Sequence, residues 1–169
     1  MTTRATRVPA SLARGWAGVL LGGLVAGLLD ITYAFIILGL RGRSPLWVLQ
    51  SVASGLLGSA AFDSGALAGV LGLFCHFVVA LGASAVYFLA ARHLAVLREH
   101  PAWSGAAFGI LVYLFMNFVV IPLSAYPLKV SYPPRVLIRG FLAHALLVGI
   151  PIALSVRGLS FRQARRADA

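Results

Sequence analysis

Acidic residues and cysteine are scarce in this chain. Only four of the 169 residues are Asp or Glu, against 14 Lys or Arg, so an aspartate inside the apolar stretch "LLDITYAF" at residues 28–35 stands out. Cys75 is the single cysteine, which excludes an intrachain disulfide and leaves the redox compartment open. Gly-rich phosphate loops, zinc-spaced Cys/His clusters and nucleophile elbows are absent from the sequence, so it lends no support to enzymatic chemistry.

Apolar residues are abundant. They make up 60% of the chain and charged residues only 11%, with a mean hydropathy of +0.94. A helix crosses a bilayer with about 20 apolar residues. Four such runs are present, at residues 16–40, 66–92, 104–124 and 135–156. The sequence therefore predicts an all-α membrane protein, a four-transmembrane-helix bundle that forms a single transmembrane domain over residues 1–169.

The segment between the first two runs predicts a shorter helix at residues 45–57. Ser44 followed by Pro45 is typical of a helix start, and Gly58 offers a stop. The apolar residues recur at helical spacing while polar ones gather on one side, a pattern that we interpret as too polar for a fifth crossing. We expect an interfacial helix on the outer surface, and the alternative is a re-entrant segment covered by protein.

The N-terminal 15 residues contain three arginines and no acid. The apolar run that follows has about 25 residues, which exceeds the 7 to 15 of a cleavable signal peptide, so we expect it to stay as the first membrane helix. An Arg-rich transit peptide is the alternative.

The distribution of charge predicts topology. A net charge of +10 would suggest nucleic acid for a soluble protein, but here the basic residues flank membrane helices, so we expect membrane lipids and no nucleic acid as partners. Nine basic residues flank the helices on the side of the termini: Arg4, Arg7, Arg14, Arg92, Arg98, Arg157, Arg162, Arg165 and Arg166. Five flank them on the other side: Arg41, Arg43, Lys129, Arg135 and Arg139. The positive-inside rule then places both termini in the cytoplasm.

Four polar residues, one on each long helix, share nearly one depth. At a rise of about 1.5 Å per residue, Asp30, His76, Asn117 and His144 all lie within about 5 Å of the midpoints of their helices. Glycine and alanine share their faces, including Gly18-x-x-x-Gly22 and similar patterns that indicate close helix packing. Polar groups inside a membrane usually meet one another, so we expect Asp30 to pair with His76 or His144.

Three interpretations of this polar layer stay open. It is a hydrogen-bonded clasp that fixes helix register, a proton- or ion-linked pathway, or a site where His76 and His144 ligate haem or another metal. A haem attachment motif is absent, so the sequence predicts no cofactor. Four residues qualify as a second layer around it: Tyr33, Tyr87, Tyr113 and Arg139. The tyrosines either pack or extend the network, and Arg139 reaches the outer interface or gates an anion.

The last three helices resemble the YagU-type bacterial inner-membrane proteins, a family of small helical proteins without an assigned activity. The similarity rests on His76 with Tyr87 eleven residues later, on His144 after a small residue, and on "WSGAAFGILVYLFMNFVVIPL". This resemblance implies a location in the bacterial inner membrane.

Two function classes follow from these patterns. The first is a non-catalytic membrane component that binds lipid or a partner membrane protein, with the polar layer as its internal clasp. The second is a small proton- or ion-linked transporter or channel subunit, expected to be a homo-oligomer because four short helices rarely enclose a pathway alone. A pathway needs water beside the polar layer, whereas a clasp is dry and mutually satisfied.

Overall fold

The computed structural model describes residues 10–161, and every regular element within that range is a helix. Residues 1–9 and 162–169, which contain five of the basic residues that we assign to the side of the termini, lie outside the described residues. The elements are α1 (Ala10–Gly39), α2 (Pro45–Leu57), η1 (Gly58–Phe62), α3 (Gly65–His93), α4 (Ala95–Glu99), α5 (Pro101–Phe115), η2 (Met116–Val120), α6 (Ile121–Leu123), α7 (Pro134–Ala143), η3 (His144–Gly149), α8 (Ile150–Ser155) and η4 (Val156–Phe161).

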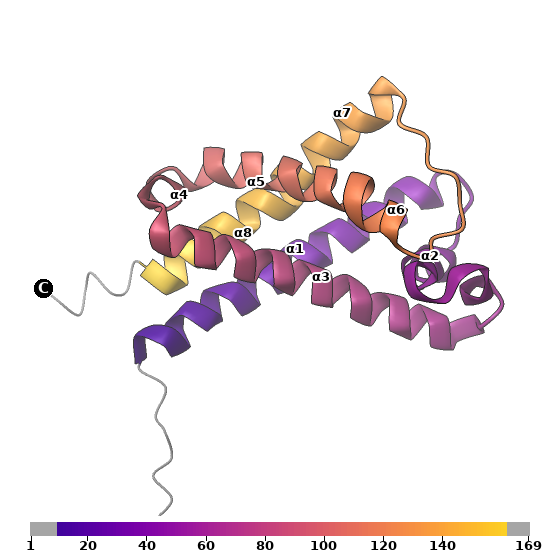
Figure 1. Cartoon of the computed structure of the whole chain (residues 1–169), viewed down its shortest axis with the longest axis horizontal. Helices are drawn as coiled ribbons and strands as arrows, with labels where there is room; N and C mark the ends of the chain where they lie inside the picture. The colour runs from indigo at the N-terminus through magenta and orange to yellow at the C-terminus, as the bar shows by residue number, and fades with distance from the viewer. Residues whose placement is uncertain (1–9, 162–169) are drawn as a thin grey trace, which may run out of the picture.

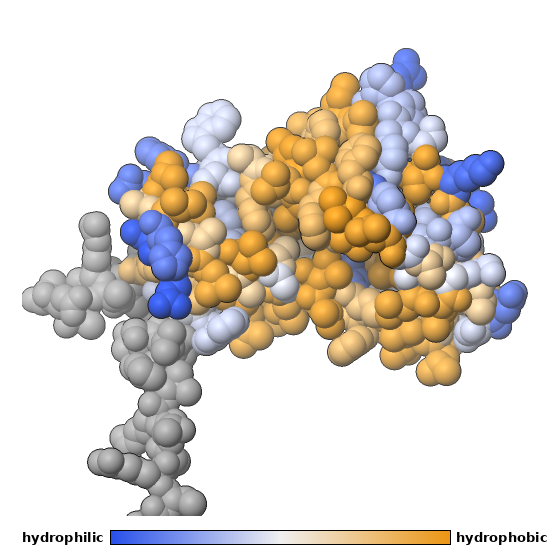
Figure 2. All heavy atoms as spheres, in the orientation of Figure 1, coloured by the Kyte–Doolittle hydropathy of each residue, from blue (hydrophilic) through white to orange (hydrophobic). Residues whose placement is uncertain are grey.

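The exterior of the bundle is apolar. Five of the described helical stretches are long and apolar enough to cross a membrane: Gly15–Gly39, Pro45–Phe62, Gly65–His93, Pro101–Leu123 and Pro134–Phe161. Figure 2 shows a broad hydrophobic face between two more polar ends. Such an exterior is stable in hydrocarbon and unstable in water, so the chain is a multi-pass membrane protein.

The long helices run back and forth along one axis. The start of α1, the short helix α4 and the end of the last helix gather at one end of the molecule, while α2 and the loop after α6 lie at the other (Figure 1). In this view α2 is seen end-on, so it runs across the long helices. We call these the terminal end and the α2 end.

Helix α2 forms with the boundaries and start signals that the sequence predicts. The hydroxyl of Ser44 accepts a hydrogen bond from the backbone N–H of Trp47 at 3.1 Å, Pro45 occupies the first turn, and Gly58 ends the helix with a positive φ of 60°. The 3₁₀ turn that follows extends the helical stretch to Phe62, which makes it 18 residues long. By length and composition it therefore qualifies as a fifth crossing, contrary to our interpretation that it is too polar, and the count of four crossings stays a prediction.

Glycines set the closest helix contacts. Gly23 and Gly27 of α1 face α3, Gly18 faces the last helix, and Gly22 lies against both α3 and the last helix. A Cβ added at any of these four positions would lie about 3.2 Å or less from an atom of the facing helix. Small residues let backbones approach closely inside a membrane, so α1 is held on two sides.

The seam between α5 and η3 is tighter. The backbone of Gly105 contacts that of Gly149, and Gly109 lies against the carbonyl oxygen of His144. Contacts between two backbones leave no side chain that can move aside. This seam therefore fixes the position of η3, including His144.

Packing differs between the two ends of the bundle. The main apolar core lies toward the terminal end and is formed by α1, α3, η3, α8 and η4. Its buried residues are Val19, Ala26, Tyr87, Phe88, Ala91, Val148, Ile152, Ala153 and Val156. A smaller cluster of alanines joins α2, η1 and α3 at the other end. Between these two clusters lies the cavity described below.

Two π-helical segments precede prolines. The N–H of Ile121 bonds to the carbonyl of Met116, five residues earlier, and Pro122 follows. In that register the carbonyl of Asn117 would pair with the nitrogen of Pro122, which carries no hydrogen. The hydroxyl of Tyr132 donates to this carbonyl instead, at 2.9 Å. The segment η3 before Pro151 has the same i to i−5 pattern, and such segments often occur at functional sites.

A buried hydroxyl of α3 has no hydrogen-bond partner among the described residues. Ser84 is fully buried on α3, and its Oγ finds no hydrogen-bond partner among the described residues. A buried polar group without a partner costs about 1–3 kcal/mol. We therefore expect Ser84→Ala to raise the free energy of unfolding in detergent by about 1 kcal/mol, measured by titration with a denaturing detergent.

Ser104→Ala is the matched control for this change. The Ser104 hydroxyl bonds to the carbonyl of His100 and contacts the hydroxyl of Tyr87, both at 2.8 Å. Its removal is expected to lower the free energy of unfolding by about 1 kcal/mol. A loss of stability in Ser84→Ala of similar size would show that its hydroxyl has a partner such as a buried water.

Candidate functional site

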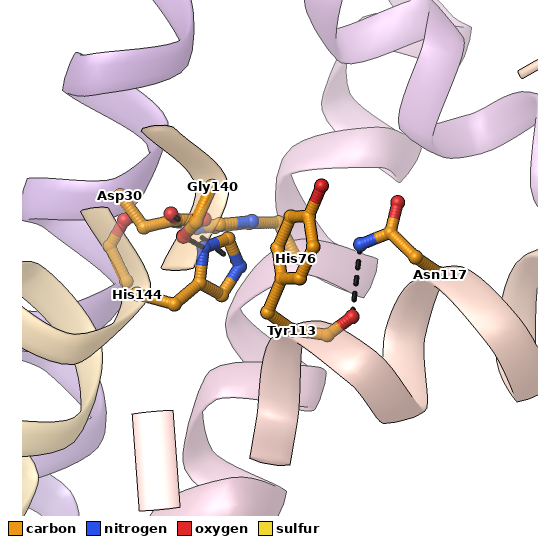
Figure 3. Close-up of polar contacts among 7 residues, drawn as sticks. Asp30, His76, Tyr113, Asn117, Gly140 and His144 are labelled. Carbon is orange, nitrogen blue, oxygen red and sulfur yellow. Dashed lines mark hydrogen bonds and ion pairs between the residues drawn. The ribbon is translucent and has the colours of Figure 1, made fainter. Parts of the chain in front are cut away.

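Three of the four predicted polar residues surround one cavity. Asp30 comes from α1, His76 from α3 and His144 from the first turn of η3, and all three line a space of about 170 Å³. The rest of the lining is apolar or backbone: Ala26, Gly27, Val52, Val79, Ala80, Ala83, Val112, Met116 and Val148. We call this space the polar cavity. Figure 3 shows the two histidines and the aspartate converging from different helices.

Hydrogen bonds to backbone carbonyls orient both imidazoles. His76 Nε2 lies 2.8 Å from the carbonyl oxygen of Gly27, and His144 Nδ1 lies 3.1 Å from that of Gly140. A carbonyl only accepts, so each of these ring nitrogens carries the hydrogen. In a neutral ring the second nitrogen is then an acceptor. The two histidines therefore bring one acceptor nitrogen each, Nδ1 of His76 and Nε2 of His144.

The nearest contact between ionisable groups joins Asp30 and His144. Oδ1 of Asp30 and Nε2 of His144 are 4.0 Å apart, and their side chains are 24% and 20% exposed. A hydrogen bond needs about 3 Å, so these groups are close enough for electrostatic coupling but do not bond directly. Of the two partners expected for Asp30, the structure places His144 in contact.

Asn117 lies apart from this group. It does not line the polar cavity, and its side-chain amide donates at 2.9 Å to the carbonyl of Tyr113 on its own helix. Figure 3 shows it on the far side of Tyr113 from Asp30 and His144. Asn117 belongs instead to the π segment and to its bond with Tyr132.

The predicted second layer is divided among several places. The Tyr113 ring packs edge-on against His144, with ring centres 5.0 Å apart, and covers Gly140. Tyr33 and Arg139 line a separate surface hollow between α1 and α7. Tyr87 lies toward the terminal end, where its hydroxyl donates to the carbonyl of Leu97 at 2.9 Å. Only Tyr113 therefore contacts the polar cavity residues.

Other contributors to the site carry no sequence signal. The carbonyls of Gly27 and Gly140 fix the imidazoles, but a backbone acceptor cannot be recognised from residue type. Val52 reaches the cavity from α2 and Met116 from the start of η2. Their role depends on where α2 crosses the bundle, which a periodic pattern does not define.

The chemistry of the polar cavity is that of a hydrogen-bond acceptor site. With neutral imidazoles, the carboxylate and the two free ring nitrogens all accept hydrogen bonds. Among residues 10–161, no group of three or more His, Cys, Asp or Glu side chains is arranged to hold a metal ion. Comparison of the chain with protein-family models, curated proteins and solved structures finds no match, so the geometry of the polar cavity is the basis for assigning function.

Proposed function

We propose that this protein is a non-catalytic component of the bacterial inner membrane that binds a small polar group inside the bilayer. The observation that carries the proposal is the polar cavity, where three ionisable side chains from three helices surround about 170 Å³ of space. Ionisable residues at membrane depth are expensive and usually serve function. Here they line a space rather than fill it.

The geometry favours a binding cavity over a dry clasp. A clasp requires its polar groups to bond to one another, but the Asp30 and His144 atoms are 4.0 Å apart. The cavity is several times larger than the minimum that holds one water molecule, and its three ionisable side chains offer the partners that water needs. We therefore expect the unliganded cavity to be hydrated.

A binding role also fits the closed terminal end better than a pathway does. The apolar core that includes Val19, Tyr87 and Ile152 lies between the cavity and the terminal end. A route for ions would have to pass through that core. The second candidate, a proton-linked transporter or channel subunit, is favoured by the Asp30 and His144 contact, which brings two ionisable groups together inside the membrane.

Proton flux into liposomes separates these two candidates. We expect wild-type proteoliposomes to acidify no faster than protein-free liposomes, and Asp30→Asn to behave in the same way. A wild-type flux that Asp30→Asn abolishes would support the proton-linked candidate instead.

The proposed topology places the cavity near the middle of the bilayer. Four long helices cross the membrane, α2 lies across their outer end, and both termini are cytoplasmic, which agrees with the excess of basic residues on the terminal side. The resemblance to YagU-type proteins supports the inner membrane. Membrane lipids surround the apolar exterior, and further copies of the chain or a partner membrane protein are compatible with it.

Hydration of the polar cavity is the property to test. In a Cys75→Ser background, Ala80→Cys places a thiol in the cavity wall, and a small water-soluble thiosulfonate then reports whether water reaches it. We expect labelling at least about tenfold faster than in either control, because thiolate forms poorly in apolar surroundings. The rate is measured by mass spectrometry of protein in nanodiscs.

Two cysteine variants serve as controls. Ala153→Cys replaces a fully buried alanine of the main core, and Val78→Cys lies on the lipid-facing surface, where Val78 is 51% exposed. Labelling of Ala80→Cys as slow as that of Ala153→Cys would mean a dry clasp and would overturn the proposal.

A further inference from the structure

An apolar groove opens beside the polar cavity, between α3 and α5. It encloses about 460 Å³, and its walls are almost entirely apolar. It extends along α5 and η2 from Phe108 to Val120, about 18 Å at ~1.5 Å per residue. We call it the α3–α5 groove. In Figure 1 these helices meet near α4 and separate toward α2. Val86, Leu111 and Phe115 of the groove are more than half exposed, so the groove opens on the apolar exterior.

The groove and the polar cavity are adjacent and share part of their walls. Four residues line both: Val79 and Ala83 of α3, Val112 of α5 and Met116 of η2. These four side chains lie between the two spaces. A ligand that occupied both spaces would enter between these side chains from within the bilayer.

The polar end of this combined site selects for a hydrogen-bond donor with positive charge. Gly27 and Gly140 already occupy the N–H groups of the two imidazoles, so Asp30, His76 and His144 offer acceptors. A phosphate or carboxylate headgroup would meet the carboxylate of Asp30 and find no free donor. An ammonium group has three donors and a charge that complements Asp30.

We propose that the polar cavity and the α3–α5 groove together bind a single-chain amphiphile with a protonated amine head. The ammonium lies beside Asp30, within reach of the free nitrogens of His76 and His144. The hydrocarbon chain lies between α3 and α5. This inference rests on the proposed function, because it names the ligand class for the same cavity.

Thermal stability with matched probes tests the inference. The probes are dodecylammonium, dodecanol and dodecanoate, added at equal concentration to the full-length protein in nanodiscs at pH 7. Binding to the folded state raises the melting temperature. We expect dodecylammonium alone to raise it for wild type, and its Kd to rise about tenfold or more in Asp30→Asn, because a charge-assisted hydrogen bond is lost.

Two neighbouring valines provide the test of the groove. Val79 lines both the groove and the cavity, whereas Val78 lines neither and is 51% exposed to lipid. We expect Val79→Trp to block the entrance and abolish the dodecylammonium shift, and Val78→Trp to keep it. Both positions are partly exposed, so tryptophan is tolerated in the fold at either.

The outcomes separate this inference from the proposed function. Equal stabilisation by dodecanol would overturn the ammonium assignment, while labelling of Ala80→Cys would still uphold a hydrated cavity. Equal loss in both tryptophan variants, or loss in neither, would remove the groove from the site. A change in oligomeric state confined to Val79→Trp, with the shift kept, would mean that the groove receives a second copy of the chain.

Discussion

Gly149→Ala is expected to lower the free energy of unfolding by about 3 kcal/mol or more, the upper end of the range for overpacking. An added Cβ at this position would overlap the carbonyl oxygen of Gly105 and the backbone nitrogen of Gly109. Side chains can rotate away from an added methyl group, but these atoms belong to the backbone of α5. Relief then requires separating α5 from η3, which also displaces His144.

Gly82→Ala is the control for this substitution. Gly82 lies within α3, and a Cβ there would find no other atom within 4 Å. Alanine is expected to be neutral or to stabilise by about 0.5–1 kcal/mol, because glycine loses more backbone entropy in a helix. Both variants are measured by unfolding in a denaturing detergent. Equal stability of the two would show that the contact between α5 and η3 is looser than described.

Asp30→Leu is expected to raise the free energy of unfolding by about 2 kcal/mol, while it removes binding of dodecylammonium. Within residues 10–161 the carboxylate makes no hydrogen bond, and its nearest ionisable partner, His144, lies 4.0 Å away. When the protein unfolds in a micelle, this carboxylate reaches water. Its desolvation in the folded state therefore lowers the free energy of unfolding. Leucine removes that cost and fills part of the cavity. Stability gained with function lost is the usual signature of a functional polar group.

Thr32→Leu controls for added hydrophobicity on the same helix. Thr32 is exposed on the lipid-facing side of α1, and its replacement is expected to change stability by no more than about 0.5 kcal/mol. Unfolding in denaturing detergent provides the comparison. A loss above 1 kcal/mol in Asp30→Leu alone, on the scale of a removed hydrogen bond, would assign Asp30 to a clasp.

Much of the fold could be predicted because the bilayer imposes a length. The C-terminal ends of the four long apolar runs lie within a few residues of the observed ends of α1, α3, α6 and η4. The largest of these differences is at the last helix, which extends to Phe161. Ser44 and Pro45 mark the start of α2 by local chemistry alone. Whether a helix crosses the membrane or lies across the bundle depends on tertiary packing, so the role of α2 could not be settled in this way.

The depth of the candidate site residues in the membrane could be predicted, but the direction in which each side chain points around its helix could not. Counting residues along a helix gives height, and this placed Asp30, His76 and His144 at one level, where the structure joins them in one cavity. Asn117 has a similar height but belongs to the π segment η2, which has more residues per turn than an α-helix and therefore turns side chains away from the regular pattern. The α3–α5 groove is formed by the surfaces of two helices where they separate. The sequence of either helix alone does not indicate it.

The glycine contacts join α1 with α3 and α5 with η3, while further glycines hold α2 against α3. Gly18 and Gly22 join these pairs near the terminal end, because they hold α1 against the last helix. Asp30 belongs to one pair and His144 to the other, beyond that junction. A difference of about 1 Å in the packing of α1 against η3 would bring the 4.0 Å separation into hydrogen-bond range. The separation of these two side chains therefore depends on how the helices pack against one another and not on either helix alone.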